Sequence, residues 1–207
     1  MKKLNEGEYK FFEEKNGVPF FSTQEFHEPR EAAPHIDQHG MQRDRLVLAA
    51  DFIKDLVVEH DIKTVSDICC GDGGLLQYLQ PFFNERGVES WGFDFQIANV
   101  RAAQYQRKVN VNFADVVKDK LELGELSIMT ECLEHMHKPH QMVKKVAKQS
   151  RFFVASGPNG EVPEAHYEFH TWGWSEPAYR KLLEQAGYSV VRQETVSIFQ
   201  VVAGVKE

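Results

Sequence analysis

The sequence has few cysteines and no long apolar run, and these absences exclude several classes of protein. Three cysteines occur among 207 residues, an odd number with two adjacent: Cys69, Cys70 and Cys132. This pattern favours reduced thiols over a disulfide framework. No apolar stretch is long enough to span a bilayer, and residues 1–12 lack the apolar core of a signal peptide. We therefore expect a cytoplasmic protein with no membrane partner.

The sequence also lacks an excess of positive charge, because 31 acidic residues outnumber 24 lysines and arginines and give a formal net charge of −7. An extended surface for duplex DNA needs clustered cations that neutralise phosphates, so duplex DNA is not an expected partner. The hydrophobic content of 42% is enough for one sizeable α/β core. We predict one domain over residues 40–207 and an N-terminal extension over residues 1–39.

The stretch Thr64–Leu79 has the pattern of a buried strand, a tight bend and a helix. β-Branched residues open it, glycines 71, 73 and 74 follow, and leucines at helical spacing close it. Glycine lets the backbone turn sharply and lie close to a ligand. The first free N–H groups of the helix point into the same space.

Acidic residues follow the next predicted strands. Residues 88–93 end at Asp94, about twenty residues beyond the glycine bend, where an acid meets ribose hydroxyls in a nucleotide-binding unit. A cap on the helix predicted over residues 96–108 is the alternative role. Residues 109–114 end at Asp115, and residues 126–130 run into Glu131. In a doubly wound sheet these positions lie at the ligand-binding edge.

Residues 65–73, VSDICCGDG, resemble motif I of the class I S-adenosylmethionine (SAM) dependent methyltransferases, usually V-L-D-x-G-C-G-x-G, of the small-molecule type. Cys69 replaces the first family glycine. The resemblance implies a Rossmann-like α/β fold, with a seven-stranded, mostly parallel sheet, an antiparallel last strand and helices on both faces. It also implies SAM as the cofactor. The cofactor-binding residues that it implies are Asp67, Cys69, Gly71, Gly73, Asp94, Phe95, Asp115, Val116 and Glu131.

Within this resemblance, each acid has an expected role. Asp94 is expected at the ribose. Asp115 and the backbone N–H of Val116 are expected at the adenine, although a loop aspartate before an ordinary turn is the alternative for Asp115. Glu131 is expected beside the reacting methyl group. Gln42 and Arg43, at the start of a helix predicted over residues 40–60, are candidates for the methionine carboxylate.

Residues 131–135, ECLEH, resemble the E-x-x-E-H cluster of ubiquinone-type O-methyltransferases and of Hen1-type small-RNA 2′-O-methyltransferases. His170, followed by Thr171 and Trp172, is similar to the later metal histidine of the Hen1 family. That likeness implies a divalent-metal site formed by Glu131, Glu134, His135 and His170, suited to Mg, Mn, Fe or Zn. A metal-free site with His135 or His170 as the base, and purely structural histidines, are the alternatives.

The predicted activity is methyl transfer to an oxygen or nitrogen of a small polar acceptor, with Glu131, His135 and His170 as the catalytic residues. One alternative is metal-dependent 2′-O-methylation of RNA of the Hen1 type. Another is a non-catalytic SAM-binding module, because Cys69 at the bend could crowd the cofactor. The oligomeric state has no signal in the sequence.

The first forty residues fall outside the family pattern. Aromatic runs flank Asn16-Gly17, a dipeptide that favours a tight hairpin turn. A proline-punctuated stretch with histidines follows. We expect a small hairpin, and either a surface strap or a lid that closes over the cofactor and the acceptor. At the other end, a helix over residues 175–187 and strands over 188–193 and 195–205 should close the sheet.

Overall fold

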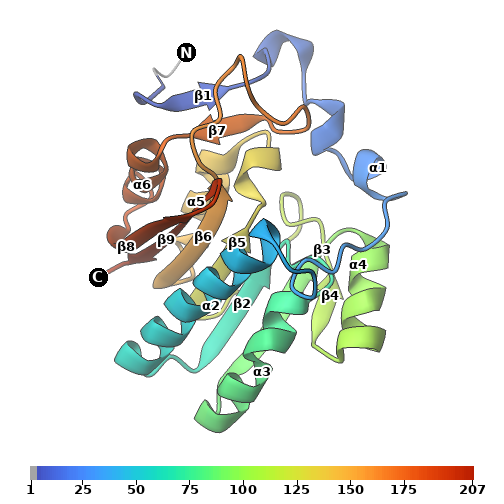
Figure 1. Ribbon diagram of the computed structural model, residues 1–207, viewed down its shortest axis with the longest axis vertical. Helices are drawn as coiled ribbons and strands as arrows, with labels where there is room; N and C mark the ends of the chain where they lie inside the picture. The colour runs from blue at the N-terminus through green and yellow to red at the C-terminus, as the bar shows by residue number, and fades with distance from the viewer. Residues whose placement is uncertain (1–3) are drawn as a thin grey trace.

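The computed structural model describes residues 4–207, so residues 1–3 of the predicted extension lie outside the described part. A seven-stranded sheet runs through it in the order β4-β3-β2-β5-β6-β9-β8 (Figure 1). Only β9 runs antiparallel to its neighbours, β6 and β8. This topology confirms the predicted fold class. The strands are β2 (Thr64–Ile68), β3 (Glu89–Asp94), β4 (Val111–Phe113), β5 (Leu126–Thr130), β6 (Phe152–Pro158), β8 (Ser189–Val196) and β9 (Phe199–Val205).

Helices cover both faces of the sheet, as a parallel sheet requires. One face carries α2 (Met41–His60), α3 (Gly74–Arg86) and α4 (Ile97–Arg101), which continues as a π-helix over Ala102–Arg107. The opposite face carries α5 (Pro139–Val146) and α6 (Glu176–Glu184). The predicted positions of α2, α4 with its π-helical extension, and α6 agree with the structure to within a few residues.

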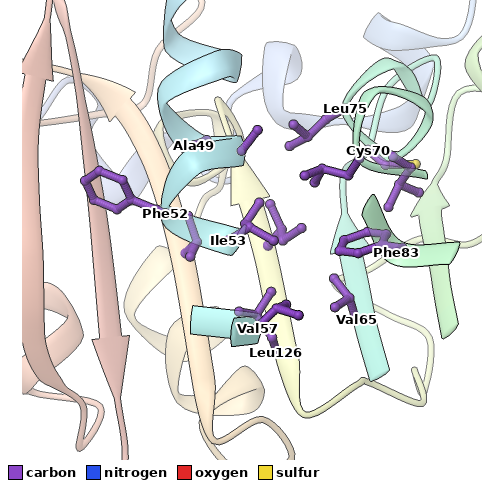
Figure 2. Close-up of a cluster of buried hydrophobic side chains, with 14 of the residues drawn as sticks. Ala49, Phe52, Ile53, Val57, Val65, Cys70, Leu75, Phe83 and Leu126 are labelled. Atoms are coloured by element: carbon purple, nitrogen blue, oxygen red, sulfur yellow. The ribbon is translucent and has the colours of Figure 1, made fainter. Parts of the chain in front are cut away.

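The core forms two apolar layers because successive side chains of a strand point to opposite faces. In β6, Phe152 and Val154 join the layer under α2 and α3, whereas Phe153 and Ala155 join the layer under α5 and α6. Figure 2 shows α2 directing Ile53 and other apolar side chains toward the sheet. The resulting rigid sheet fixes where each strand ends, and therefore where each polar residue beyond a strand is placed.

The predicted N-terminal hairpin is wrong. Instead, β1 (Glu8–Lys10) pairs antiparallel with β7 (Trp172–Trp174), which lies far along the chain. Residues 9–22 contain two short 3₁₀ turns, Glu14–Asn16 and Phe20–Ser22, before α1 (Gln24–His27). Gly17 does have a positive φ of 81°, but it ends the first of these turns rather than joining two strands.

The hairpin does not form because β1 pairs with the distant strand β7 instead. Glu8 is buried, and its carboxylate accepts hydrogen bonds from the Trp174 indole N–H and the Asn5 backbone N–H. On the other side of the turn, Pro19 has no N–H to donate to a hairpin ladder.

Among residues 4–207, no helix combines the length and apolar character needed to span a bilayer.

Removing apolar contacts under α2 is expected to destabilise the whole sheet. Ile53 is fully buried, so Ile53→Ala should lower the free energy of unfolding by roughly 2–5 kcal/mol. Val58 on the same helix is 52% exposed, and Val58→Ala should change it by less than about 0.5 kcal/mol. Urea unfolding followed by circular dichroism measures both. Equal losses in the two variants would contradict this account of the core.

Candidate active site

The ends of four adjacent parallel strands open into one cleft of about 1510 Å³. Asp67, Asp94, Asp115 and Glu131, the acids expected at these ends, all line it. The predicted residues Cys69, Gly71, Phe95, Val116, His135 and His170 line it as well. Gly73 and Glu134 are not among the residues that line it. The volume exceeds the range of roughly 300–1,000 Å³ typical of single-ligand pockets, so a cofactor and an acceptor fit together.

Glycine is required at the bend between β2 and α3. Gly73 has a φ of 75°, and a Cβ there would lie 2.6 Å from Val109 Cγ2. Gly71, with a φ of 58°, donates its backbone N–H to Asp94 Oδ2 at 2.9 Å. Cys69 also has a positive φ, 60°, although it carries a side chain. The replacement of the family glycine therefore keeps the glycine-like backbone.

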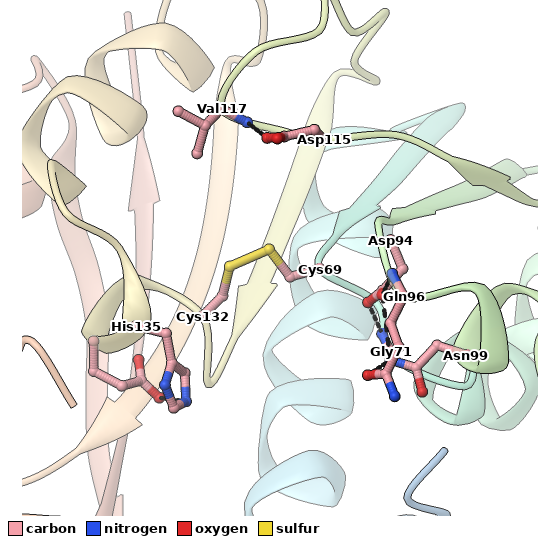
Figure 3. The surroundings of a disulfide bond; sticks show 10 residues. Cys69, Gly71, Asp94, Gln96, Asn99, Asp115, Val117, Cys132 and His135 are labelled. Carbon is pink, nitrogen blue, oxygen red and sulfur yellow. Dashed lines mark hydrogen bonds and ion pairs between the residues drawn. A yellow bond between two sulfur atoms is a disulfide. The ribbon is translucent and has the colours of Figure 1, made fainter. Parts of the chain in front are cut away.

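The expectation of three reduced thiols is wrong in this structure, because Cys69 and Cys132 form a disulfide (Figure 3). They follow β2 and β5, which are paired parallel strands, so their ends lie together at one edge of the sheet. The two Cα atoms are 6.2 Å apart, within the usual range for a disulfide. Cys70 is free and buried. Burial and the nearby carboxylates raise the pKa of its thiol well above the ordinary range.

Asp94 holds the glycine bend in place. Its carboxylate accepts hydrogen bonds from the N–H groups of Gly71 and Gln96 and from the Asn99 amide (Figure 3). Burial raises the pKa of Asp94 to about 6, although these hydrogen bonds favour its charged form. Its side chain is therefore already fixed at the place where the ribose hydroxyls are expected.

Asp67 is buried with fewer hydrogen-bond partners than Asp94. It is 1% exposed, and its Oδ1 has no hydrogen-bond partner among the described residues. Burial and the nearby Asp94 raise its pKa from an ordinary 3.8 to about 8, against the opposing effect of Arg45. An unpartnered buried carboxyl oxygen is costly, so a ligand that brings a donor or a positive charge to the cleft would stabilise it.

Asp115 lies at the other end of the cleft in a more open position. Partial burial alone would raise its pKa, but the Lys118 ammonium and two backbone N–H groups outweigh burial and hold the pKa below its ordinary value. One of these donors is the Val117 N–H, at 3.0 Å from Oδ1 (Figure 3). The carboxylate is thus oriented and charged where the adenine amino group is expected.

Arg45 is a site residue that the sequence reasoning missed. It is 2% exposed, lines the cleft, and its Nε lies 3.9 Å from Glu131 Oε1. Its guanidinium also donates to the side chains of Ser156 and Gln42. Arg43, by contrast, donates to the Ile36 carbonyl. A signal existed, because Arg45 falls on the apolar face of α2, where a cation needs a buried partner.

Two glutamates stand beside this arginine, Glu131 with 18% of its side chain exposed and Glu134 with none. Glu131 has a φ of 51°, an uncommon backbone conformation for a residue other than glycine. Glu134 is fully buried, and neither of its carboxylate oxygens has a hydrogen-bond partner among residues 4–207. Burial raises the pKa of both glutamates, and the charge of Glu131 raises that of Glu134 further. The pair therefore favours a compensating cation.

Two histidines face the same glutamates with a fixed orientation. His135 Nδ1 is 3.1 Å from the Phe169 carbonyl oxygen, and His170 Nδ1 is 2.7 Å from Glu161 Oε2. Both partners accept, so each Nδ1 carries a proton. Burial and the neighbouring His170 hold the pKa of His135 at about 3, so this ring is neutral. In a neutral ring with a protonated Nδ1, Nε2 offers a lone pair.

Ligand atoms of Glu134, His135 and His170 lie within 4.8 Å of one another. Carboxylate and imidazole together suit Mg, Mn, Fe or Zn. Glu131, the fourth predicted ligand, lies outside this group and near Arg45. The donor set therefore fits a divalent cation with three of the four predicted ligands.

The N-terminal segment covers one side of the cleft. His27, Arg30 and His35 line it, and the His27 ring lies 5.4 Å from the Phe95 ring and 6.2 Å from the His135 ring. Phe26 also contacts Phe169, with ring centroids 4.8 Å apart. The position of this segment is compatible with either the strap or the lid.

A family profile described as a methyltransferase domain matches residues 41–193. No protein of curated function matches the sequence significantly.

Solved structures share the fold at low sequence identity. The N-methyltransferase NodS from Bradyrhizobium japonicum, crystallised with S-adenosylhomocysteine, is 12% identical with a TM-score of 0.69 over 90% of this chain and 97% of its own. The methyltransferase domain of a bacterial Hen1 is 18% identical, with a TM-score of 0.61 over 76% and 96%. The 1,6-didemethyltoxoflavin-N1-methyltransferase from Burkholderia thailandensis is 18% identical, with a TM-score of 0.59 over 78% of this chain and 77% of its own.

The raised pKa of Asp67 predicts a pH-dependent penalty. Between pH 3.8 and about 8 the folded protein binds a proton that the unfolded chain releases, so Asp67 makes the folded state less stable as the pH rises. Asp67→Asn removes this penalty. The unfolding free energy of the variant minus that of the ligand-free wild type should therefore increase between pH 5 and 7.5, by at most about 1.4 kcal/mol per pH unit.

Urea unfolding at several pH values measures this difference. Asp51→Asn supplies the control, because it removes one carboxylate from an exposed position on α2, outside the cleft. A flat profile for Asp67→Asn would show that Asp67 is not buried as a neutral acid.

Proposed function

The chain belongs to the methyltransferase domain family and is a SAM-dependent methyltransferase, and we propose that it methylates an oxygen or nitrogen of a polar acceptor bound beside Glu131, His135 and His170. The observation that carries the proposal is the cluster itself: the partly buried Glu131 and the fully buried Glu134 lie with two oriented histidines at the cleft lined by most of the predicted cofactor residues. When SAM is bound, it supplies a sulfonium-activated methyl group to the acceptor.

Each part of SAM has a candidate partner in the cleft. Asp94 and Asp115 both line it, and we assign Asp94 to the ribose hydroxyls and Asp115 to the adenine amino group. The bend at Gly71 leaves open space where a Cβ would stand, so the ligand can approach the backbone. Arg45 is a buried cationic residue that lines the cleft beside Glu131, and it is our candidate for the methionine carboxylate, in place of Arg43.

The acceptor must be held with a lone pair directed at the methyl group, and a hydroxyl acceptor must lose its proton. Glu131 lies at the tip of β5, in the cleft, where it can accept a hydrogen bond from the acceptor. His135 and His170 offer Nε2 lone pairs toward the same region. Their placement supports roles in orienting and deprotonating the acceptor.

We further propose that Glu134, His135 and His170, with Glu131 nearby, hold a divalent cation. The two unpartnered oxygens of the fully buried Glu134 support this, because an uncompensated buried carboxylate is strongly unfavourable. A bound cation would supply Lewis acidity that lowers the pKa of an acceptor hydroxyl. Without a cation, burial and the charge of Glu131 raise the pKa of Glu134 and so favour its protonated form.

A small polar molecule is the acceptor we propose first, and an RNA 2′-hydroxyl is the second candidate. The second is supported by the E-x-x-E-H cluster together with His170, the arrangement that resembles the Hen1 family. Labelled methyl transfer from SAM into the small-molecule and short-RNA fractions of a cell extract distinguishes the two. Nuclease treatment should release the label only if RNA is the acceptor.

Substitutions should separate cofactor binding from acceptor activation. Asp94→Ala should weaken SAM binding by at least about tenfold, because the ribose loses a charged acceptor. His135→Ala should leave SAM binding within about twofold and slow methyl transfer by about 100-fold or more. Calorimetric titration with SAM and S-adenosylhomocysteine measures the first effect, and the labelled transfer assay measures the second.

Equal loss of SAM affinity in both variants would contradict this separation of roles. If neither SAM nor S-adenosylhomocysteine produced heat with the wild type, a non-catalytic module without the cofactor would replace the proposal. Glu59→Ala, on the exposed face of α2, serves as the matched control and should behave like the wild type.

The cation proposal predicts that a chelator removes activity. EDTA should abolish transfer, and Mn²⁺ in excess should restore it. Mn²⁺ alone should bind the wild type in calorimetry at about one site per chain, and Glu134→Gln and His170→Ala should each reduce that affinity by at least about tenfold. The exposed His39 gives the control, since His39→Ala should bind Mn²⁺ normally. Unchanged turnover in EDTA would favour the metal-free site.

A further inference from the structure

The loop between β6 and β7 orients both histidines of the site. Its Phe169 carbonyl oxygen accepts from His135 Nδ1 at 3.1 Å, and its Glu161 carboxylate accepts from His170 Nδ1 at 2.7 Å. The first contact is made by the backbone and is independent of the side chain at 169. The second depends on one side chain to which neither the sequence pattern nor the family resemblance gave a role.

The Glu161 carboxylate is shared between two donors of this loop. Oε1 accepts the Tyr167 backbone N–H at 2.9 Å, and Oε2 accepts His170 Nδ1–H. The Glu161 side chain is 16% exposed and that of His170 is 8% exposed, so water competes little for the bond between them. A carboxylate can satisfy both donors at once because it is an acceptor at both oxygens.

We propose that Glu161 is a positioning residue, which fixes the Nδ1–H tautomer of His170 and directs its Nε2 lone pair into the cleft. This inference deepens the proposed function and rests on it for the use of that lone pair. A histidine that binds a metal commonly donates its other ring N–H to a carboxylate or carbonyl, which sets the tautomer and the ring direction. Here both arrangements occur side by side, a carbonyl on His135 and a carboxylate on His170.

Substitutions of Glu161 should grade the effect. Glu161→Ala removes both acceptor oxygens. Glu161→Gln keeps one acceptor oxygen, for which Tyr167 N–H and His170 Nδ1–H must compete, while the amide NH₂ can only donate. Glu168 is exposed in the same loop, so Glu168→Gln removes the same charge without touching His170. The fraction of His170 in the Nδ1–H tautomer should therefore be highest in the wild type, lower in Glu161→Gln and lowest in Glu161→Ala.

The primary measurement is the tautomer of His170 in the full, metal-free chain, read from long-range ¹⁵N–¹H correlation spectra and assigned by comparison with His170→Gln. The wild type and Glu168→Gln should show protonated Nδ1 and unprotonated Nε2. Glu161→Ala should shift His170 toward the Nε2–H form. A purely structural brace on the loop would leave the tautomer unchanged.

The second measurement is calorimetric titration with Mn²⁺. Affinity should fall about 10- to 100-fold in Glu161→Ala, by less in Glu161→Gln, and not in Glu168→Gln. SAM titration reports whether each variant keeps its fold, and Glu161→Gln carries the test if Glu161→Ala does not fold. An Nε2–H tautomer in the wild type, or an unchanged tautomer in a folded Glu161 variant, would overturn the inference. If the wild type binds no Mn²⁺, the cation proposal fails, and the tautomer still decides the role of Glu161.

Discussion

The structure depends on one electrostatic constraint: a parallel sheet places the carboxylates beyond its strands at one buried edge, with one buried arginine to oppose them. Asp67, Glu131 and Glu134 have raised pKa values because of burial, and Arg45 is the buried cation among them. The unpartnered oxygens of these three acids mark the places where the ligand-free protein lacks positive charge. Two cationic ligands would supply it, the sulfonium and ammonium of SAM and a divalent ion. The same excess of buried negative charge therefore favours binding of the cationic cofactor and destabilises the ligand-free fold, so ligand binding should stabilise the folded protein.

The sheet and its acids were predictable from the sequence because each signal is local. A β-branched run, a glycine bend and an acid about twenty residues later report on one βαβ unit, whereas the seven-stranded, mostly parallel sheet was implied by the family resemblance. The antiparallel position of β9 came from the family resemblance. Asp67, Asp94, Asp115 and Glu131 reached one cleft because strand ends share an edge.

The features that the sequence analysis did not predict all depend on contacts between residues far apart in the chain. The partner of β1 is β7, and nothing in residues 9–22 identifies Trp172–Trp174 as that partner. The Cys69–Cys132 disulfide joins residues 63 positions apart, which become neighbours only when β2 and β5 pair. Arg45 was visible as a charge on an apolar helix face, but its partner Glu131 depended on the fold. Glu161 gave no signal, because its role exists only when the loop brings His170 to it.

The N-terminal segment over residues 18–37 contacts both the loop between β6 and β7 and the helix that follows β3. These contacts limit how it could open as a lid. Toward the C-terminal half, Phe26 contacts Phe169. Toward the N-terminal half, Gln96 donates its side-chain amide to the Arg30 carbonyl, and Arg107 forms ion pairs with Asp37 of the segment and with Asp72 of the glycine bend. Asp37 lies close in sequence to α2, which is packed on the sheet, so a hinge near Asp37 is the natural one. With that hinge, opening would break the Phe26–Phe169 contact and keep the ion pair between Asp37 and Arg107. Movement of the segment from residue 18 to residue 35 would then uncover His27 and the acceptor side of the cleft while Arg107 still held the cofactor bend. That order would admit an acceptor without releasing the cofactor, which a methyltransferase requires if SAM binds first.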